Sequence, residues 1–219
     1  MTYTQFTLFS TFFGELVDDA LGSIVYGFET ISSRNAIRAN SAIQIPERGG
    51  VFIVVQRGVI TTKFLNHDLF LSENAWCATD NGANFTILTD SVVAVFQTLN
   101  YHGTISFGII EPEGRLKYID GCKDSILFQP IKHGLPCLNA LYMPNGIHQT
   151  AHTHPSARAG IILSGFGRCV AEDRQCGLHP GAVFYLPANK THKFRTDYSG
   201  AAVKLAVYHP DSVTGHQET

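Results

Sequence analysis

Histidines gather in one short segment of the chain. The segment GIHQTAHTHPSARAGIILSG spans residues 146–165 and holds His148, His152 and His154 within seven residues. Residues two apart on a β-strand share a face, so His152 and His154 point the same way if this segment is an extended strand of a hairpin. Two imidazoles on one face can bind one metal ion at about 2.0–2.2 Å, provided that a third ligand comes from elsewhere. The segment GAVFYLPANKTH, residues 181–192, ends in His192 and supplies that candidate.

The two segments resemble the two signature motifs of the cupin superfamily, G(X)5HXH(X)3–4E(X)6G and G(X)5PXG(X)2H(X)3N. The positions that match are Gly146, His152, His154 and Gly165 in the first motif, and Gly181, Pro187 and His192 in the second. Three positions depart from the pattern: Arg158 replaces the Glu ligand, Asn189 the inner Gly and Thr196 the final Asn. The resemblance implies an all-β fold of jelly-roll barrels, each a double-stranded β-helix. It also implies a metal held by His152, His154 and His192.

Arg158 is the departure that bears most on chemistry. A guanidinium cannot bind a cation, but its planar fork can hold a carboxylate with two parallel hydrogen bonds. Three-histidine sites without the Glu resemble those of thiol and diketone-cleaving dioxygenases, and in some thiol dioxygenases an arginine holds the acid group of the substrate. We therefore expect Arg158 to be a catalytic-site residue that binds a substrate acid, with a structural ion pair as the alternative.

His148 is the candidate general acid or base. It lies four residues before His152, so on a regular strand it would face the barrel interior with His152 and His154. An unperturbed imidazole titrates near neutral pH and can move a proton there. The alternative is a hydrogen-bonded histidine at the barrel rim.

An internal repeat divides the chain. GGVFIVVQRG at 49–58 is similar to ARAGIILSGFG at 157–167, and an offset of 107 places Gly58 on Gly165. At the same offset the ligand positions and Arg158 correspond to Ile45, Glu47, Val51 and Phe85. We therefore expect a degenerate cupin barrel at residues 1–100, connecting strands at 101–135 and a metal-binding cupin barrel at 136–219.

Net charge, the N-terminal segment and the cysteines bear on the partners and the cellular location of the protein. A net charge of −2 gives no reason to expect nucleic acid or an anionic membrane as a partner. Residues 5–20 are apolar but interrupted by Glu15, Asp18 and Asp19, so we expect a short amphipathic helix or strand rather than a signal peptide or membrane helix. Five cysteines without a CxxC motif indicate reduced thiols, although Cys169 and Cys176 are spaced to face each other across a hairpin. We expect a cytoplasmic protein.

The leading hypothesis is a cytoplasmic homodimer with one divalent metal in its second barrel. Fe(II) is the preferred ion, and Zn, Ni, Mn or Cu are alternatives for the same ligands. The expected function is a non-haem Fe(II) dioxygenase that acts on a small acid-bearing molecule. One alternative is a lyase, isomerase or decarboxylase that uses the metal as a Lewis acid. Another is a non-catalytic cupin that binds a small molecule, and a third is a barrel whose histidines bind no metal.

Overall fold

The computed structural model of the chain describes residues 3–19, 22–30, 40–172, 174–196 and 202–211. Nearly all regular structure in these ranges is β, and the helical element described is the short 3₁₀ turn η1, Ile119–Gly121. None of the helical structure in the described ranges is long and apolar enough to cross a membrane. The expectation of an all-β fold is confirmed.

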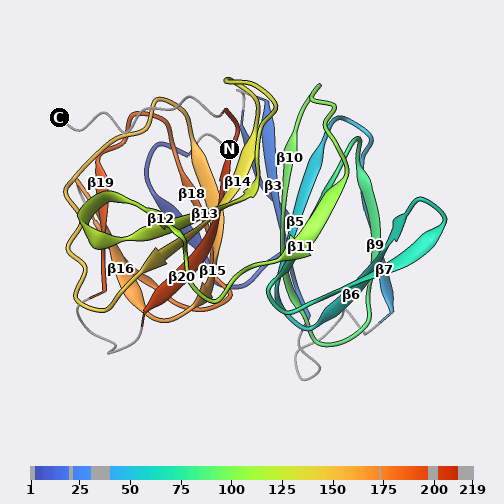
Figure 1. Ribbon diagram of the computed structural model, residues 1–219, viewed down its shortest axis with the longest axis horizontal. Helices are drawn as coiled ribbons and strands as arrows, with labels where there is room; N and C mark the ends of the chain where they lie inside the picture. The colour runs from blue at the N-terminus through green and yellow to red at the C-terminus, as the bar shows by residue number, and fades with distance from the viewer. Residues whose placement is uncertain (1–2, 20–21, 31–39, 173, 197–201, 212–219) are drawn as a thin grey trace. The chain divides into compact units, whose positions relative to one another are not determined.

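The chain forms two compact units (Figure 1). The N-terminal unit is Thr11–Ile110, and the C-terminal unit combines Met1–Ser10 with Glu111–Thr219. These bounds differ from the predicted division at residues 100 and 135. The first ten residues belong to the C-terminal unit because β1 pairs with β18. The predicted connecting segment is shared, because its first strand, β11, pairs with β8 of the N-terminal unit and its later strands belong to the C-terminal unit.

Two antiparallel sheets form the N-terminal unit. The larger sheet has the order β11-β8-β5-β10-β3-β2, and the smaller has the order β4-β9-β6-β7. The strands are β2 (Phe13–Asp19), β3 (Ser23–Glu29), β4 (Ser41–Ile45), β5 (Val51–Arg57), β6 (Val59–Phe64), β7 (His67–Ser72), β8 (Ala75–Thr79), β9 (Ala83–Ile87), β10 (Val92–Thr98) and β11 (Ser106–Ile109).

The C-terminal unit repeats this arrangement. Its larger sheet has the order β1-β18-β15-β20-β14-β13-β12, and its smaller sheet has the order β17-β16-β19. The strands are β1 (Thr7–Phe9), β12 (Leu116–Lys117), β13 (Lys123–Phe128), β14 (Cys137–Met143), β15 (Arg158–Ser164), β16 (Gly167–Ala171), β17 (Gln175–Leu178), β18 (Val183–Leu186), β19 (His192–Arg195) and β20 (Val203–His209).

The predicted repeat is visible in the strand order. The run β8-β5-β10-β3-β2 of the first unit corresponds in order to β18-β15-β20-β14-β13 of the second. An additional strand pairs with β8 and with β18: β11 follows the body of its unit, whereas β1 precedes β2 in the chain. The second sheet is also extended by β12, which pairs with β13. These segments form strands because they are rich in β-branched and aromatic residues. Their successive side chains point to the two faces of the sheet, both of which are largely buried. Residues 5–20, predicted as a helix or strand, form β1 and β2.

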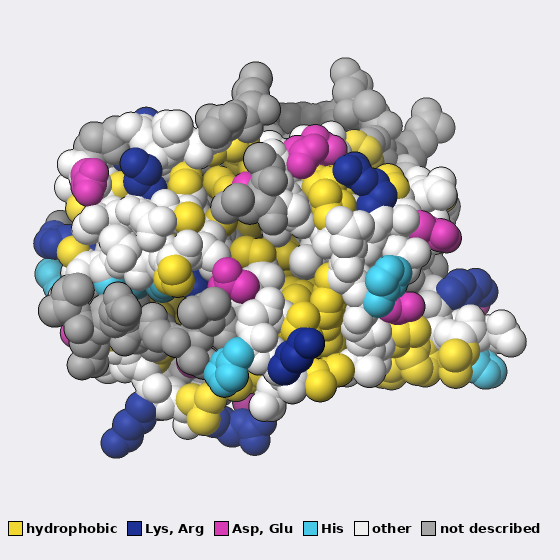
Figure 2. Space-filling view, turned by 90° about the horizontal axis from the view of Figure 1, so that it is seen from above, with side chains coloured by type: hydrophobic (Ala, Val, Ile, Leu, Met, Phe, Trp, Pro, Cys, Tyr) yellow, Lys and Arg dark blue, Asp and Glu magenta, His cyan; other side chains and the backbone are white. Residues whose placement is uncertain are grey.

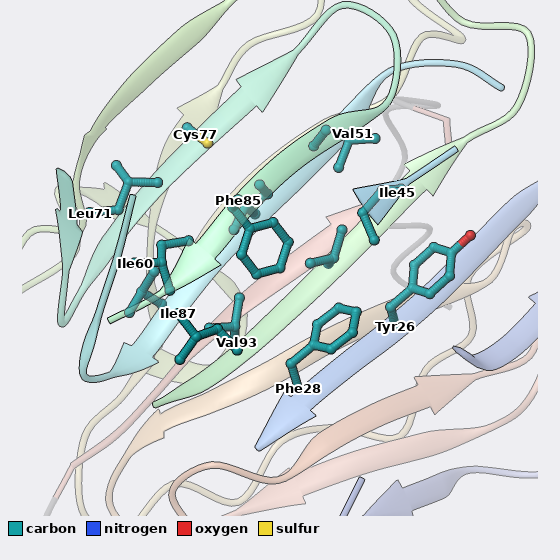
Figure 3. Packing of buried hydrophobic residues seen from close by; sticks show 14 of the residues in the cluster. Tyr26, Phe28, Ile45, Val51, Ile60, Leu71, Cys77, Phe85, Ile87 and Val93 are labelled. Atoms are coloured by element: carbon teal, nitrogen blue, oxygen red, sulfur yellow. The ribbon is translucent and has the colours of Figure 1, made fainter. Parts of the chain in front are cut away.

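Apolar side chains fill the interior of the N-terminal unit (Figure 3). Ile45, Val51 and Phe85 belong to this core and are at most 3% exposed, while Glu47 is exposed to solvent. Of the positions aligned with the three histidines, Ile45 and Phe85 are therefore packed hydrocarbon, and Glu47 is an exposed carboxylate. This agrees with a degenerate first barrel.

One detail of the repeat alignment is wrong. Ile45 pairs with Ala83, whereas the corresponding His152 pairs with His192. The structural counterpart of His192 is thus Ala83 rather than Phe85. Residues 187–191 connect β18 to β19, but only residues 80–82 connect β8 to β9, so the loop before His192 is two residues longer.

Large hydrophobic side chains are also exposed at the surface, and Figure 2 shows such side chains among polar ones on one face. Phe107 and Ile109 of the edge strand β11 are 45% and 64% exposed. The homodimer expected from the sequence stays a prediction.

Candidate metal centre

Two backbone segments hold the three histidines together. His152 and His192 form an antiparallel bridge, in which the amide nitrogen of each donates to the carbonyl oxygen of the other at 3.0 Å. The amide of Asn189 donates to the carbonyl of His154 at 2.7 Å, so the loop before β19 also fixes the segment that carries His154. The ligand candidates are therefore positioned by main-chain hydrogen bonds, which do not depend on side-chain rotamers.

The imidazoles converge on one point. Their ring centroids lie 4.5 Å apart for His152 and His192, 5.0 Å for His152 and His154, and 5.1 Å for His154 and His192. One ring nitrogen from each lies within 4.8 Å of the other two. Nδ1 of His152 donates to the carbonyl of Thr150 at 2.9 Å, and Nδ1 of His192 to the carbonyl of Lys190 at 3.1 Å. These bonds place the proton on Nδ1 and leave the Nε2 lone pair for a metal, as in known histidine sites.

Burial keeps two of these rings neutral. Desolvation, with the charge of Arg158 and the neighbouring histidines, lowers the pKa of His154 to about 2. Burial and the nearby His152 lower the pKa of His192 to about 4. A metal binds the neutral imidazole, so the two histidines are ready to act as ligands at neutral pH. The donor set thus fits a divalent ion of borderline softness.

Two of the departures from the cupin motifs have structural explanations. Asn189, at the position of a motif glycine, has a φ of 58°, and asparagine is among the few other residues that adopt this left-handed conformation readily. Thr196, at the position of the motif asparagine, accepts a hydrogen bond from the amide of Ile147 at 2.9 Å and donates its own hydroxyl to the carbonyl of Pro144. Both replacements keep the loops that carry the histidines in place.

The histidines lie at a cavity of about 60 Å³ inside the C-terminal unit. A cavity of this size holds roughly four to six waters, or a ligand of a few heavy atoms. Apolar side chains form one part of its wall: Leu141, Phe184, Leu186, Phe194 and Val207. Polar side chains form the rest: Tyr118, Asp124, Asn139, Gln149, Arg158 and His209. An apolar pocket with a few converging polar groups is the usual form of a small-molecule site.

Arg158 reaches this cavity and is only 5% exposed. Its Nη1 donates to the carbonyl of Ala157 at 2.9 Å and also to the carbonyl and hydroxyl of Ser156. Its Nε is buried and donates to no acceptor within the described residues. Burial lowers the pKa of the guanidinium, and the negative charge of Asp211 opposes that shift. Arg158 is thus partly structural and partly available to a ligand.

The predicted orientation of His148 is wrong. His148 is exposed and does not line the cavity, whereas its neighbour Gln149 is buried and does. His148 is bridged to Arg195, and His152 is bridged to His192. The four residue steps from His148 to His152 therefore lie opposite only three steps, from Arg195 to His192. The extra residue is a bulge, and it reverses the alternation of side chains that a regular strand would keep between His148 and His152.

Sequence reasoning did not single out Asp124 and Asn139, which lie on adjacent strands β13 and β14. Nδ2 of Asn139 donates to Oδ2 of Asp124 at 2.9 Å. Burial raises the pKa of Asp124 to about 6, although this hydrogen bond and one from the Ser125 amide act in the opposite direction. A polar residue within an otherwise apolar strand, as Asn139 is in CLNALYM, is the signal that could have identified this pair.

Part of the segment 120–123 supports the site indirectly. The Asp120 carboxylate accepts hydrogen bonds from the amide and hydroxyl of Thr150, two residues before His152. Sγ of Cys122 accepts one from Nε2 of Gln149 at 3.4 Å. Lys123 instead pairs with Glu113 in an exposed ion pair. Asp120 and Cys122 therefore support the segment that carries the histidines.

Comparison with known proteins gives one family match and a set of solved structures with a similar fold. Residues 140–208, which include all three histidines, match the family model described as Cupin domain. The solved structures that match share the fold over most of the chain, with 95% and 98% of it covered in two of them. The family match covers the part of the C-terminal unit that holds the three histidines. No curated protein sequence matches the chain.

Three of these structures show a similar fold at low sequence identity. Protein Ylba from E. coli has a TM-score of 0.66 at 17% identity, with 98% of this chain and 95% of that chain covered. A cupin 2 conserved barrel domain protein from Leptotrichia buccalis has a TM-score of 0.63 at 13% identity, covering 95% and 90%. Salicylate 1,2-dioxygenase from Pseudoaminobacter salicylatoxidans, in complex with gentisate, has a TM-score of 0.60 at 9% identity, covering 87% and 68%. At these identities the similarity shows the fold alone.

Proposed function

We propose that the protein is a metal-dependent cupin enzyme, and that it is a non-haem Fe(II) dioxygenase acting on a small acid-bearing molecule. The observation that carries the proposal is the convergence of His152, His154 and His192, with two Nδ1 protons held by carbonyls, on a cavity that Arg158 also reaches. One protein of similar fold, salicylate 1,2-dioxygenase, is named for this type of chemistry.

Each group of the chain has a separate task in this proposal. The three histidines hold the ion, which when bound supplies open positions for substrate and O₂. Arg158 offers its unpartnered Nε to the acid group of the substrate and so fixes the orientation of the molecule. The apolar wall, including Phe184 and Phe194, excludes bulk water from the reacting atoms.

A second function is favoured by Asp124. A carboxyl with a pKa of about 6 in the cavity wall can take or give a proton near neutral pH. The bound metal would then act as a Lewis acid in a lyase, isomerase or decarboxylase reaction. In this version Asp124, rather than the exposed His148, moves the proton.

Metal analysis and O₂ uptake distinguish these functions. The protein is purified without added metal, its metal content is measured by mass spectrometry, and O₂ consumption is followed with a panel of small acids. Iron together with acid-dependent O₂ consumption supports the dioxygenase. Zinc or nickel without O₂ consumption supports the second function, and a protein purified free of metal contradicts both and supports a binding protein.

A further inference from the structure

Asp124 and Asn139 form a second polar point in the cavity wall, separate from the histidines and Arg158. Nδ2 of Asn139 donates a hydrogen bond to Oδ2 of Asp124 at 2.9 Å. Oδ1 is the other polar atom of the Asn139 side chain. That oxygen is buried and accepts no hydrogen bond within the described residues. A buried acceptor without a donor costs free energy, and a donor supplied by a ligand would remove that cost.

The charge of Asp124 points to the same kind of ligand. Its two oxygens accept from the Ser125 amide at 2.8 Å and from Asn139, both neutral donors. Asp124 forms no ion pair within the ranges that the structure describes. A partly buried carboxylate with only neutral partners retains capacity for a further donor, above all a charged one.

Arg158 stands across the sheet from this pair. The sheet order β15-β20-β14-β13 places one strand between Arg158 and Asn139. Asn139 is in register with Gly160 through Val207, and Arg158 lies two residues farther along β15. At a strand spacing of about 4.8 Å and a rise of about 3.4 Å per residue, the Cα atoms of Arg158 and Asn139 are roughly 12 Å apart. Both side chains line the same cavity, so a small molecule can lie between them. The cavity therefore offers a donor on one side and acceptors on the other.

We propose that Asp124 and Asn139 are specificity residues that bind a hydroxyl or amino group of the substrate, while its acid group lies at Arg158. The substrate class is then a small acid that carries a hydrogen-bond donor a few bonds from the acid group. This inference depends on the proposed function only for the acid anchor, Arg158. The site for the donor group of the substrate is defined by Asp124 and Asn139 themselves.

Three matched acids test the inference: butyrate, 4-hydroxybutyrate and 4-aminobutyrate. Their Kd values for the metal-loaded full chain are measured by titration calorimetry at pH 7.5. The two donor-bearing acids should bind roughly tenfold or more tightly than butyrate. Asn139→Leu should abolish that advantage. Asp124→Asn should reduce it more for 4-aminobutyrate than for 4-hydroxybutyrate, because it removes the negative charge, and it decides the question if Asn139→Leu does not fold.

Two controls separate this site from the rest of the protein. Arg158→Met should weaken all three acids by the same factor, because the acid group is common to them. It also removes the hydrogen bonds of Nη1 to Ser156 and Ala157, so its folding is checked by thermal unfolding. Asn84→Leu makes the same change at an exposed position of β9 and should leave all three Kd values unchanged. Equal Kd values for the three acids in the unaltered protein would overturn the inference and leave the acid anchor intact.

If none of the acids binds, the acid anchor of the proposed function is wrong, and butylamine and 1-butanol then decide the donor site. Binding of either one that is lost in Asn139→Leu supports the inference. Absence of binding by both overturns it.

Discussion

At the scale of single residues, the histidines have a role that the rest of the barrel does not need. The surrounding core, with Ile162, Leu205 and Phe184, is an apolar cluster of its own, which contacts the imidazoles through Phe194 against His192. We therefore expect His152→Ala, His154→Ala and His192→Ala each to remove most of the bound metal and leave the fold intact. Metal stoichiometry and thermal unfolding of the three variants measure this, and full metal occupancy in all three would contradict the assignment.

Arg158 can be tested by two opposite changes. Arg158→Lys keeps the charge but loses the planar fork, so the KM for an acidic substrate should rise while metal stays bound. Arg158→Glu should restore an oxygen ligand at the motif position, tighten metal binding and repel the acid. Because Nη1 also holds the carbonyls of Ser156 and Ala157, both variants should lose some stability. Normal KM values in both would show that Arg158 is structural only.

The raised pKa of Asp124 predicts that the free energy of unfolding depends on pH. Its pKa is about 6 in the folded protein and 3.8 as an unperturbed carboxyl, so folding favours the protonated form. The folded state is consequently destabilised as pH rises from about 4 to 6, by roughly 1–3 kcal/mol at the upper end. Asp124→Asn should raise the free energy of unfolding at pH 7.5 and change it little at pH 4. Denaturant unfolding at the two pH values measures the difference, and an equal effect at both would exclude this cause.

At the scale of strands and loops, the sequence predicted those features that depend on fixed spacing. Two histidines two residues apart and a third after a Gly-strand-Pro segment defined the cluster, and the structure brings all three together. Cys169 and Cys176 do lie directly opposite each other in the β16–β17 hairpin, as free thiols. Spacing sufficed here because the backbone is regular, or is fixed by motif residues such as Gly165, whose φ is 79°.

The features that sequence reasoning missed depend on irregular backbone. A single extra residue between His148 and His152 turned His148 outward, and nothing in the local residue types reveals a bulge. The ungapped repeat alignment misassigned Phe85 for a similar reason, because a loop two residues longer precedes His192. Asp124 and Asn139 meet only through the pairing of β13 with β14, which is a property of the folded sheet.

Phe85 illustrates the role of β9 in the N-terminal unit. Its ring is 3% exposed and packs edge to face against Phe28, with centroids 5.6 Å apart. Phe85→Ala should lower the free energy of unfolding by about 3–5 kcal/mol and leave the metal content unchanged. Chemical denaturation together with metal analysis tests both parts. Loss of metal without loss of stability would argue against a single metal centre in the C-terminal unit.

At the scale of the whole molecule, the first ten residues complete the C-terminal unit. Phe6 is 1% exposed and stacks on Phe184, a cavity-lining residue, at a centroid distance of 5.8 Å. Deletion of residues 1–10 should lower the melting temperature of this unit and weaken metal binding, because the wall behind Phe184 loses its support. Phe6→Ala should do so in part, and Thr4→Ala, at an exposed position, should have no effect. Calorimetry of the three variants distinguishes them, and an unchanged melting curve after deletion would refute this role for β1.

The pairing of β1 with β18 has a consequence for how the protein is made. Leu8 meets Phe184 in the sheet, so β1 cannot reach its partner until the residues up to β18 have left the ribosome. At about 5–20 residues per second, that wait lasts roughly 10–35 s. Meanwhile residues 11–110, which belong to the other compact unit, are already made, and β1 stays without its partner strand. During synthesis β1 is therefore open to mispairing, and the barrel that carries the histidines closes only after β18 has been made.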